Sequence, residues 1–448
     1  MRRIKFLIVG LLIMPLLISC VRNDALNDRV GTADETVVET ENAETLPEEE
    51  KAQNGGDPDE TDVSQEEDTG RIVEGRFDIT YAVSGIALKD AFRDYFRMGV
   101  GINGNAITNA SVRSEALNRI KAYHFNSTTY TNLMKPDFLL YQQGSISNYQ
   151  SGNPEPALRF DSIIEGMEFC VANNINMRGH VLIWHNQVPE WLFREGYQQT
   201  GDFVDRETML NRMRSYIRQV LEFTQTNYPG VITCWDVVNE AVAVTAGGYE
   251  TQSGFYIRTT FGENRDNLWY KVIGADYFVK AFEFARRYAG ADVKLFYNDY
   301  NTFQPVKTER IFALISHLKE LGLIDGIGMQ GHMGLDYPGI SAGNHNIKAA
   351  IERFAQLGLE IQITELSINS GNDDEISMQR QADRYEELFR LLTQMDTAGG
   401  GPANITSVTV FGLMDRYLFY PADRTFSRLF DGRLQPKPSF RSVMSVVE

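Results

Sequence analysis

This sequence has few cysteines, and its basic residues are outnumbered by acidic ones. Its 448 residues include 3 cysteines, too few for a disulfide scaffold and without the spacing of a zinc site. Its 43 Lys and Arg residues stand against 60 Asp and Glu residues, a formal net charge of -17. Because a nucleic-acid binder needs basic patches that neutralise phosphates, this balance argues against nucleic acid as a partner. The apolar fraction of 43% is ordinary for a globular core.

Aromatic side chains are missing from residues 21–70, which hold 17 acidic groups and 3 basic ones. Such a segment cannot bury enough apolar area to offset the entropy lost on ordering, and its like charges repel. We therefore expect residues 20–75 to form a disordered acidic tether. A specific acidic binding tail is the alternative, and it is disfavoured. Most of the net charge belongs to this segment and says little about a substrate.

The apolar run at the N-terminus is too short to span a bilayer. Three basic residues among the first five precede residues 6–18, and the run ends in Leu-Ile-Ser-Cys at Cys20. A basic start before a short apolar stretch is typical of a secretory signal peptide. The ending resembles a bacterial lipoprotein signal, which implies that residues 1–19 are removed and that Cys20 is lipidated. The protein is then expected on a cell envelope, periplasmic or at the cell surface. An ordinary signal peptide with an incidental cysteine is the alternative.

Beyond residue 87, short β-rich runs alternate with longer stretches of helical periodicity. Eight strands separated by helices fit one (β/α)₈ barrel, the TIM barrel, over residues 88–448. A doubly wound open sheet is the runner-up, but no glycine-rich phosphate loop follows the first strand. The expected strands are residues 96–102, 124–129, 176–184, 233–239, 294–298, 326–332, 360–365 and 407–411. The expected helices are residues 158–172, 209–227, 277–288, 306–321, 347–357 and 374–394.

Polar side chains gather at the carboxyl ends of these strands, the face where the loops of such barrels build active sites. Glu240 follows the fourth strand and Glu365 ends the seventh. Glycoside hydrolysis requires such a pair, because one carboxylic acid protonates the leaving oxygen while the other carboxylate attacks the sugar or activates water. A lone glutamate at a strand end is more often a solvated or salt-bridged group. The matched positions of the two therefore favour catalysis.

Histidines at neighbouring strand ends admit several interpretations. His185 and His332 could be satisfied core residues, although their places beside the two carboxylates favour a substrate-contacting or orienting role. A metal site built from them and His180 is disfavoured, because no His-x-x-x-His helix or Cys-His cluster accompanies them. We expect neither a metal nor a cofactor. Cys170 and Cys234 are expected to be buried free thiols.

Five ordered segments resemble the signatures of glycoside hydrolase family 10. The family consists mainly of retaining endo-β-1,4-xylanases on a (β/α)₈ barrel, so the resemblance implies xylan or a xylo-oligosaccharide as substrate. Two shorter segments near the ends of the predicted barrel, residues 96–103 and 429–438, resemble signatures of the same family. The five segments are residues 178–192, 235–242, 295–301, 326–332 and 361–368.

The resemblance implies a role for individual residues. Glu240 matches the general acid/base and Glu365 the nucleophile, with carboxyl groups about 5–5.5 Å apart in a retaining enzyme. Asn239 matches the residue that binds the sugar 2-hydroxyl, His332 the one that orients Glu365, and Gln330 a neighbour of Glu240. The residues that match sugar-contacting positions are Asn132, Lys135, Trp184, His185, Phe411 and Phe419. Asp299 matches a position that supports the site structurally and electrostatically.

Departures from the family pattern concern the substrate more than the chemistry. Thr131 stands where the family usually has an acidic residue that contacts the distal sugar, and Pro136 replaces a tryptophan. Phe411 and Phe419 replace the two tryptophans that roof the cleft, which keeps an aromatic face but removes the N–H donor. Decorated or mixed-linkage xylan therefore stays open as the substrate. A non-catalytic glycan-binding lipoprotein is a further alternative, disfavoured because both glutamates and their polar neighbours are present.

Overall fold

The computed structural model describes residues 78–102, 110–244, 249–250, 254–261, 265–415 and 426–448. All of them belong to one compact unit, residues 62–448. The predicted signal peptide and tether lie outside these ranges, as do Cys20 and Phe419. Within the described ranges, no helix combines the length and apolar character needed to cross a membrane.

Eight parallel strands close into a barrel, so the predicted (β/α)₈ fold is confirmed. Their order is β10-β11-β13-β14-β1-β2-β3-β5, and β10 pairs with β5 to complete the ring. Two short strands, β4 (Ile183–Trp184) and β12 (His332–Gly334), pair beyond the barrel with β5 and β13. The barrel strands are β1 (Arg97–Ile102), β2 (Ser127–Tyr130), β3 (Asn176–Gly179), β5 (Ile232–Asn239), β10 (Lys294–Asp299), β11 (Gly326–Met329), β13 (Glu360–Asn369) and β14 (Asn404–Val410).

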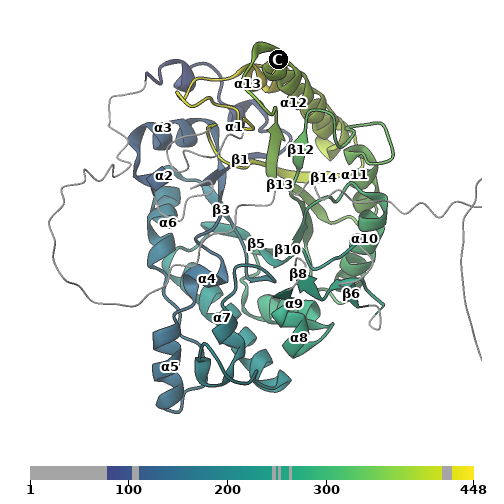
Figure 1. The fold of residues 1–448 in the computed structure, drawn as a ribbon. Coiled ribbons are helices and arrows are strands. Elements are labelled where there is room, and N and C mark those ends of the chain that lie inside the picture. The colour runs from purple at the N-terminus through teal and green to yellow at the C-terminus, as the bar shows by residue number, and fades with distance from the viewer. Residues whose placement is uncertain (1–77, 103–109, 245–248, 251–253, 262–264, 416–425) are drawn as a thin grey trace, which may run out of the picture. The chain divides into compact units, whose positions relative to one another are not determined.

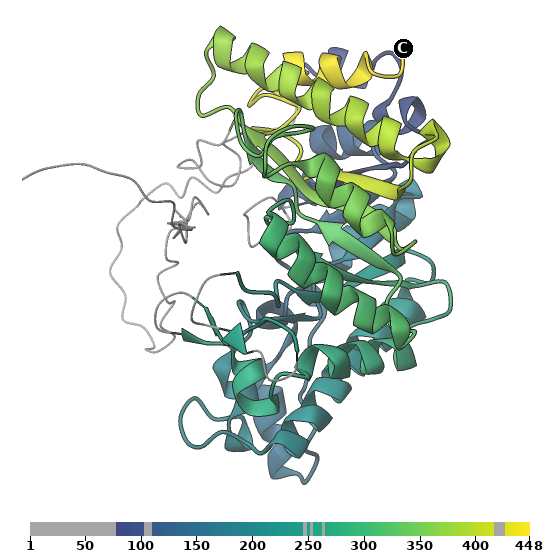
Figure 2. The same ribbon diagram turned by 90° about the vertical axis from the view of Figure 1, so that its right-hand side faces the viewer.

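Helices lie around the strands in both ribbon views (Figures 1 and 2). Side-chain oxygens of Ser114, Asp205 and Asp374 accept the backbone N–H three residues on and so begin three of the long helices. The main helices are α3 (Glu115–His124), α6 (Asp161–Asn173), α7 (Arg206–Asn227), α9 (Tyr277–Tyr288), α10 (Pro305–Glu320), α11 (Ile347–Ala355), α12 (Glu375–Met395) and α13 (Pro438–Met444). Shorter helices are α1 (Leu88–Ala91), α2 (Ala110–Arg113), α4 (Pro136–Leu139), α5 (Gln142–Gln150) and α8 (Leu268–Ile273), and β6 (Tyr249–Glu250), β7 (Ile257–Arg258), β8 (Thr260–Phe261) and β9 (Arg265–Asp266) form two small hairpins.

Several predicted element boundaries are wrong. His124 was expected to begin a strand but is the last residue of α3, where its Nε2 lies 2.6 Å from the carbonyl of Ala82. The single strands expected at 176–184 and 326–332 are each broken in two. Regular structure begins before residue 87, with the short 3₁₀ helix Tyr81–Val83. Each error arises where tertiary contacts override the local pattern.

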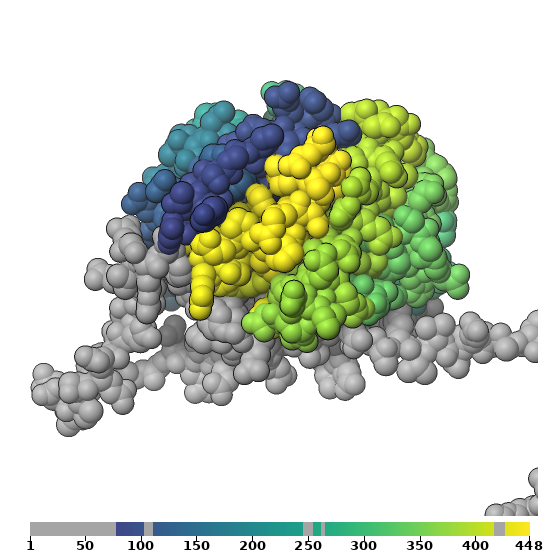
Figure 3. Space-filling model, turned by 90° about the horizontal axis from the view of Figure 1, so that it is seen from above, coloured from purple at the N-terminus to yellow at the C-terminus, as the bar shows by residue number. Residues whose placement is uncertain are grey.

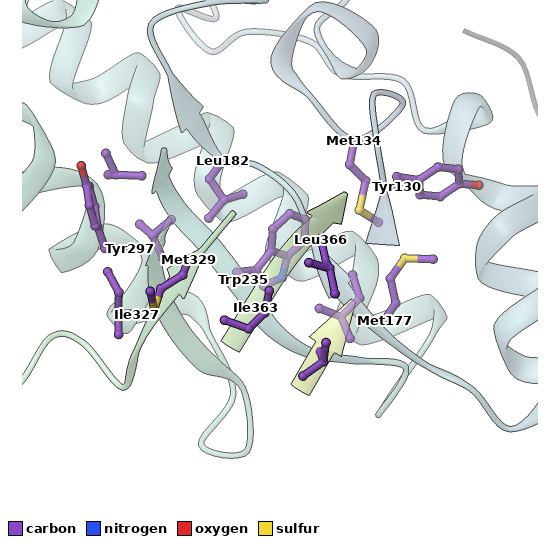
Figure 4. Close-up of a cluster of buried hydrophobic side chains, with 14 of the residues drawn as sticks. Tyr130, Met134, Met177, Leu182, Trp235, Tyr297, Ile327, Met329, Ile363 and Leu366 are labelled. Atoms are coloured by element: carbon purple, nitrogen blue, oxygen red, sulfur yellow. The ribbon is translucent and has the colours of Figure 1, made fainter. Parts of the chain in front are cut away.

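Buried hydrophobic side chains of the strands form a packed core with those of the surrounding helices. Figure 4 shows part of it around Trp235, which is 1% exposed. A Cβ at Gly179 would lie 2.4 Å from the Trp235 ring, so only glycine leaves room for the indole on the neighbouring strand. Cys170 and Cys234 are free and buried, as predicted.

The first and last described segments pack together and complete the helical layer (Figure 3). Gln435 donates through Nε2 to the carbonyl of Asp78 at 2.7 Å. The ring of Phe92 lies 5.2 Å from that of Phe389 on α12, and the His124 ring lies 5.0 Å from that of Phe440 on α13. These contacts hold α12 against the end of α1 and α13 against the end of α3, and they leave the loops after the strands to build the site.

Candidate active site

Glu240 is the first residue after β5 and has a left-handed backbone, with φ 56°. Its carboxyl group accepts three hydrogen bonds. Trp184 donates through Nε1 to Oε2 at 3.0 Å, while Gln330 and Asn239 donate their amide N–H groups to Oε1 at 2.8 and 3.1 Å. A carboxyl group held by three donors has a fixed direction, as a proton donor in catalysis needs.

Glu365 lies on β13 and is 8% exposed. Its Oε1 accepts a hydrogen bond from Asn298 Nδ2 at 3.0 Å. Its Oε2 lies 3.4 Å from Nε2 of His332, whose Nδ1 is 2.9 Å from Ser367 Oγ. The carboxylate is therefore oriented by an amide on one side and by an imidazole on the other.

Asn298 links the two halves of the site. Its Nδ2 also donates to Asn239 Oδ1 at 3.0 Å, and its Oδ1 accepts from Thr364 Oγ1 at 2.7 Å. Because Asn239 in turn donates to Glu240, two amides connect the carboxyl groups of Glu240 and Glu365. The expected carboxyl separation of about 5–5.5 Å stays a prediction.

The two carboxyl groups differ in acidity. Burial, and then the charge of Asp299, raises the pKa of Glu240, while the hydrogen bond from Gln330 opposes the rise. Burial alone would also raise the pKa of Glu365, but the hydrogen bond from His332, with nearby positive groups, outweighs it and lowers the pKa to about 2. One acid therefore tends to keep its proton where the other has lost it.

A buried aspartate supports the loop after Glu240. Asp299 forms an ion pair with Lys307 at 2.8 Å, and both side chains are inaccessible to solvent. The hydroxyl of Tyr297 donates to Asp299 Oδ2 at 2.5 Å and accepts from the backbone N–H of Val242 at 3.1 Å. Asp299 thus raises the pKa of Glu240 and, through Tyr297, helps to position the residues that follow Glu240.

A polar and aromatic cluster lies at the ends of β2 and β4. Lys135 Nζ donates to Asn132 Oδ1 at 2.8 Å and to Gln187 Oε1 at 2.6 Å, and it lies 4.7 Å from the centre of a Trp184 ring. His185 is buried, with its ring edge-on to Trp184 at 5.8 Å. These groups form a hydrogen-bonding surface with an aromatic face, a combination suited to a sugar.

The structure thus gathers most of the predicted site residues around the two glutamates. Phe411, after β14, meets the His332 ring at 5.7 Å, and Phe419 lies outside the described ranges. Sequence reasoning missed the bridging role of Asn298 and did not consider Ser367 or Arg258. The register that sets Asn298 opposite Asn239 could have revealed the bridge. For Arg258 we find no local signal.

The histidines considered as metal ligands have separate partners. His180 Nδ1 lies 2.9 Å from Asp236 Oδ2, and Asp236 is also bound by Arg178. His332 contacts Glu365 instead. Over the described part of the chain, no group of three or more His, Cys, Asp or Glu side chains is arranged to hold a metal ion.

A closed (β/α)₈ barrel, with two glutamates at its carboxyl end whose pKa values are shifted in opposite directions, defines a glycoside hydrolase of the two-carboxylate class. Comparison with known sequences identifies the family within this class. The chain belongs to glycosyl hydrolase family 10, whose sequence profile matches residues 87–446.

Related proteins and a solved structure agree with this assignment. A putative endo-1,4-beta-xylanase of Caldicellulosiruptor saccharolyticus is 45% identical over 69% of this chain and 96% of its own length. Endo-1,4-beta-xylanase B of Butyrivibrio fibrisolvens is 39% identical over 80% of this chain, which spans about half (52%) of that enzyme. The structure of the Clostridium thermocellum xylanase 10B modules with xylohexaose matches with a TM-score of 0.70 and 34% identity, over 82% of this chain and 68% of the other.

Proposed function

We propose that this chain is an endo-acting xylanase that hydrolyses β-1,4-xylosidic bonds in xylan and xylo-oligosaccharides with retention of configuration. The observation that carries the proposal is the pair Glu240 and Glu365, joined through two amides and shifted in opposite directions in pKa. The names of the relatives support the substrate class, as does the xylohexaose in one similar structure.

In the first step, a carboxylate oxygen of Glu365 attacks the anomeric carbon while Glu240 donates its proton to the glycosidic oxygen. A bond forms between Glu365 and the sugar, and the bond to the leaving group breaks. In the second step, Glu240 takes a proton from water, and the hydroxyl displaces Glu365. Asn239, which contacts Glu240 directly and Glu365 through Asn298, holds the sugar 2-hydroxyl in this scheme.

The proton affinity of Glu240 must fall between the two steps. Esterification of Glu365 removes one negative charge from the site, whereas Asp299 keeps its own. Asp299 ranks above Glu365 among the causes that raise the pKa of Glu240. The change during turnover is therefore smaller than it would be if Glu365 were the main perturbing charge.

Analysis of early products tests this function. On linear xylan, we expect internal cleavage to a ladder of oligosaccharides, and proton NMR should show new β-anomeric ends before mutarotation. A panel that includes substituted and mixed-linkage xylans addresses the substrate left open by Thr131 and Pro136. Initial α-anomers or release of xylose alone would contradict the proposal, and retention of glycan without hydrolysis would support a binding protein instead.

The pH dependence of kcat/KM follows from the two shifted acids. We expect a fall at low pH only as Glu365 takes up a proton, around its pKa of about 2. The rate should fall again as pH rises through the raised pKa of Glu240, because the proton donor is then lost. Initial rates on xylohexaose, within the range where the protein stays folded, check both limbs. An alkaline limb at the ordinary pKa of a glutamate would contradict the assignment of the acid.

We propose that acyl chains on Cys20 hold the enzyme on a bacterial envelope, with residues 20–75 as the spacer. The lipoprotein-like ending of the apolar run supports this. In cells expressing the full chain, Cys20→Ser should shift xylanase activity from the membrane fraction to the soluble fraction and abolish fatty-acid labelling. Protease accessibility in intact cells then distinguishes the surface from the periplasm. Unlabelled wild-type protein would refute the anchor.

A further inference from the structure

Arg258 lies directly behind the proposed acid/base, although no sequence motif marks it. It is the last residue of β7. Its Nε–H donates to the backbone carbonyl of Glu240 at 3.2 Å, and its backbone N–H donates to the carbonyl of Ala241 at 2.7 Å. One residue therefore satisfies two consecutive carbonyl groups just after β5.

These bonds fall where the backbone needs support. The left-handed conformation of Glu240, with φ 56°, is unfavourable for a non-glycine residue, and such a conformation persists only where its surroundings hold it. The guanidinium is itself fixed, because Nη2 donates to the Tyr300 hydroxyl at 2.8 Å. Asn267 Nδ2 donates to the carbonyl of Arg258 at 2.8 Å. The residue thus ties the end of β5 to the loop after β10.

The charge of Arg258 also acts on Glu240. Negative charges face Glu240 from two other strands, Asp299 on β10 and Glu365 on β13, and Lys307 of α10 is paired with Asp299. Burial and these negative charges raise the pKa of Glu240, whereas the positive charge of Arg258 lowers it. A proton donor whose pKa rises too far is a weak acid, so this counterweight affects the reaction.

We propose that Arg258 is a positioning residue for the acid/base, which fixes the backbone of Glu240 and sets a positive charge next to it. The inference rests on the role proposed for Glu240. Arg258 acts through that residue and makes no contact with the substrate in this scheme. Its removal should therefore impair proton donation selectively.

Two substrates separate proton donation from the rest of the first step. Xylohexaose needs a proton on the leaving oxygen, whereas the dinitrophenyl group of an aryl xylobioside departs without one. For Arg258→Met, we expect kcat/KM to fall about tenfold or more on xylohexaose and to stay within about twofold on the aryl substrate. On xylohexaose, the alkaline fall in kcat/KM should shift to higher pH by about half a pH unit or more, because a cation near Glu240 is lost. Arg258→Lys keeps the positive charge. Its alkaline fall in kcat/KM should therefore stay at the wild-type pH, and its kcat/KM on xylohexaose should lie between those of Arg258→Met and the wild type.

Arg286→Met is the matched control. Arg286 Nη2 donates to Asp325 Oδ2 at 2.7 Å, before β11 and so at the opposite end of the barrel. This variant should unfold at a lower temperature without a change in the substrate ratio or the alkaline limb. Equal losses on both substrates, or an unmoved limb in Arg258→Met, would overturn the inference.

The same comparison can be made with Arg258→Gln if Arg258→Met does not fold. The outcome also separates this inference from the proposed function. A wild-type enzyme that leaves xylan intact refutes the function itself. An active wild-type enzyme with unaffected Arg258 variants refutes only the positioning role.

Discussion

Glu365→Ala is expected to lower kcat/KM on xylan by about 10⁴-fold or more, because it removes the group that forms the covalent intermediate. The fold should persist. Asn298 and His332 lose a partner, but each keeps another, Asn239 and Ser367 respectively. Reducing-sugar release and the unfolding temperature, measured together, separate loss of chemistry from loss of structure.

An added nucleophile identifies the role of Glu365 more sharply than the loss of rate. Azide can occupy the space that Glu365→Ala vacates and attack a dinitrophenyl xylobioside in a single displacement, which gives the inverted α-azide. Glu360→Ala is the control, since Glu360 lies at the other end of β13, where its Oε2 accepts a hydrogen bond from Thr406 Oγ1 at 3.0 Å. That variant should keep wild-type activity. Near-wild-type turnover by Glu365→Ala, or no α-azide, would contradict the assignment.

The barrel and its two glutamates could be predicted from sequence because their signals are local. Each glutamate follows an apolar strand within a short motif, and eight such strands alternate with amphipathic helices. The breaks after Gly179 and Met329 could not be predicted, since they depend on pairing with β5 and β13. The strands expected there, residues 176–184 and 326–332, each mix apolar residues with glycine and polar residues, so the sequence does not mark one place for the break. Pairing with the neighbouring strands of the closed barrel decides where each of these strands ends.

The electrostatics of the site were harder to predict than its residues. In a retaining pair of this kind, burial or the charge of the second carboxylate, here Glu365, is the ordinary way to raise the pKa of the acid. Burial is indeed the main cause, but Asp299 comes next and Glu365 is the least of the named charges. Arg258 opposes them from a hairpin that no motif connects to the site. Such balances depend on distances between residues far apart in the chain, and a linear pattern contains none of them.

Glu240→Ala is expected to affect the two steps of the reaction differently, depending on the leaving group of the substrate. On xylan, kcat/KM should fall by about 10²–10⁴-fold, because the leaving oxygen receives no proton. On a dinitrophenyl xylobioside, kcat/KM should stay near the wild-type value, since that leaving group departs unaided. Its kcat should still fall, because no base activates water in the second step. The glycosyl-enzyme on Glu365 should then accumulate and be visible as a burst of dinitrophenol.

Azide should restore kcat of Glu240→Ala on the aryl substrate, because an anion needs no base and the removed carboxyl group leaves room for it. It attacks the glycosyl-enzyme from the face opposite Glu365, so the product should be the retained β-azide. The two alanine variants therefore give azides of opposite configuration if the roles are as assigned. Glu240→Gln checks the effect of space, because it keeps the volume of the side chain and should respond less to azide. An α-azide from Glu240→Ala would reverse the roles of the two glutamates, and equal losses on xylan and the aryl substrate would exclude Glu240 as the proton donor.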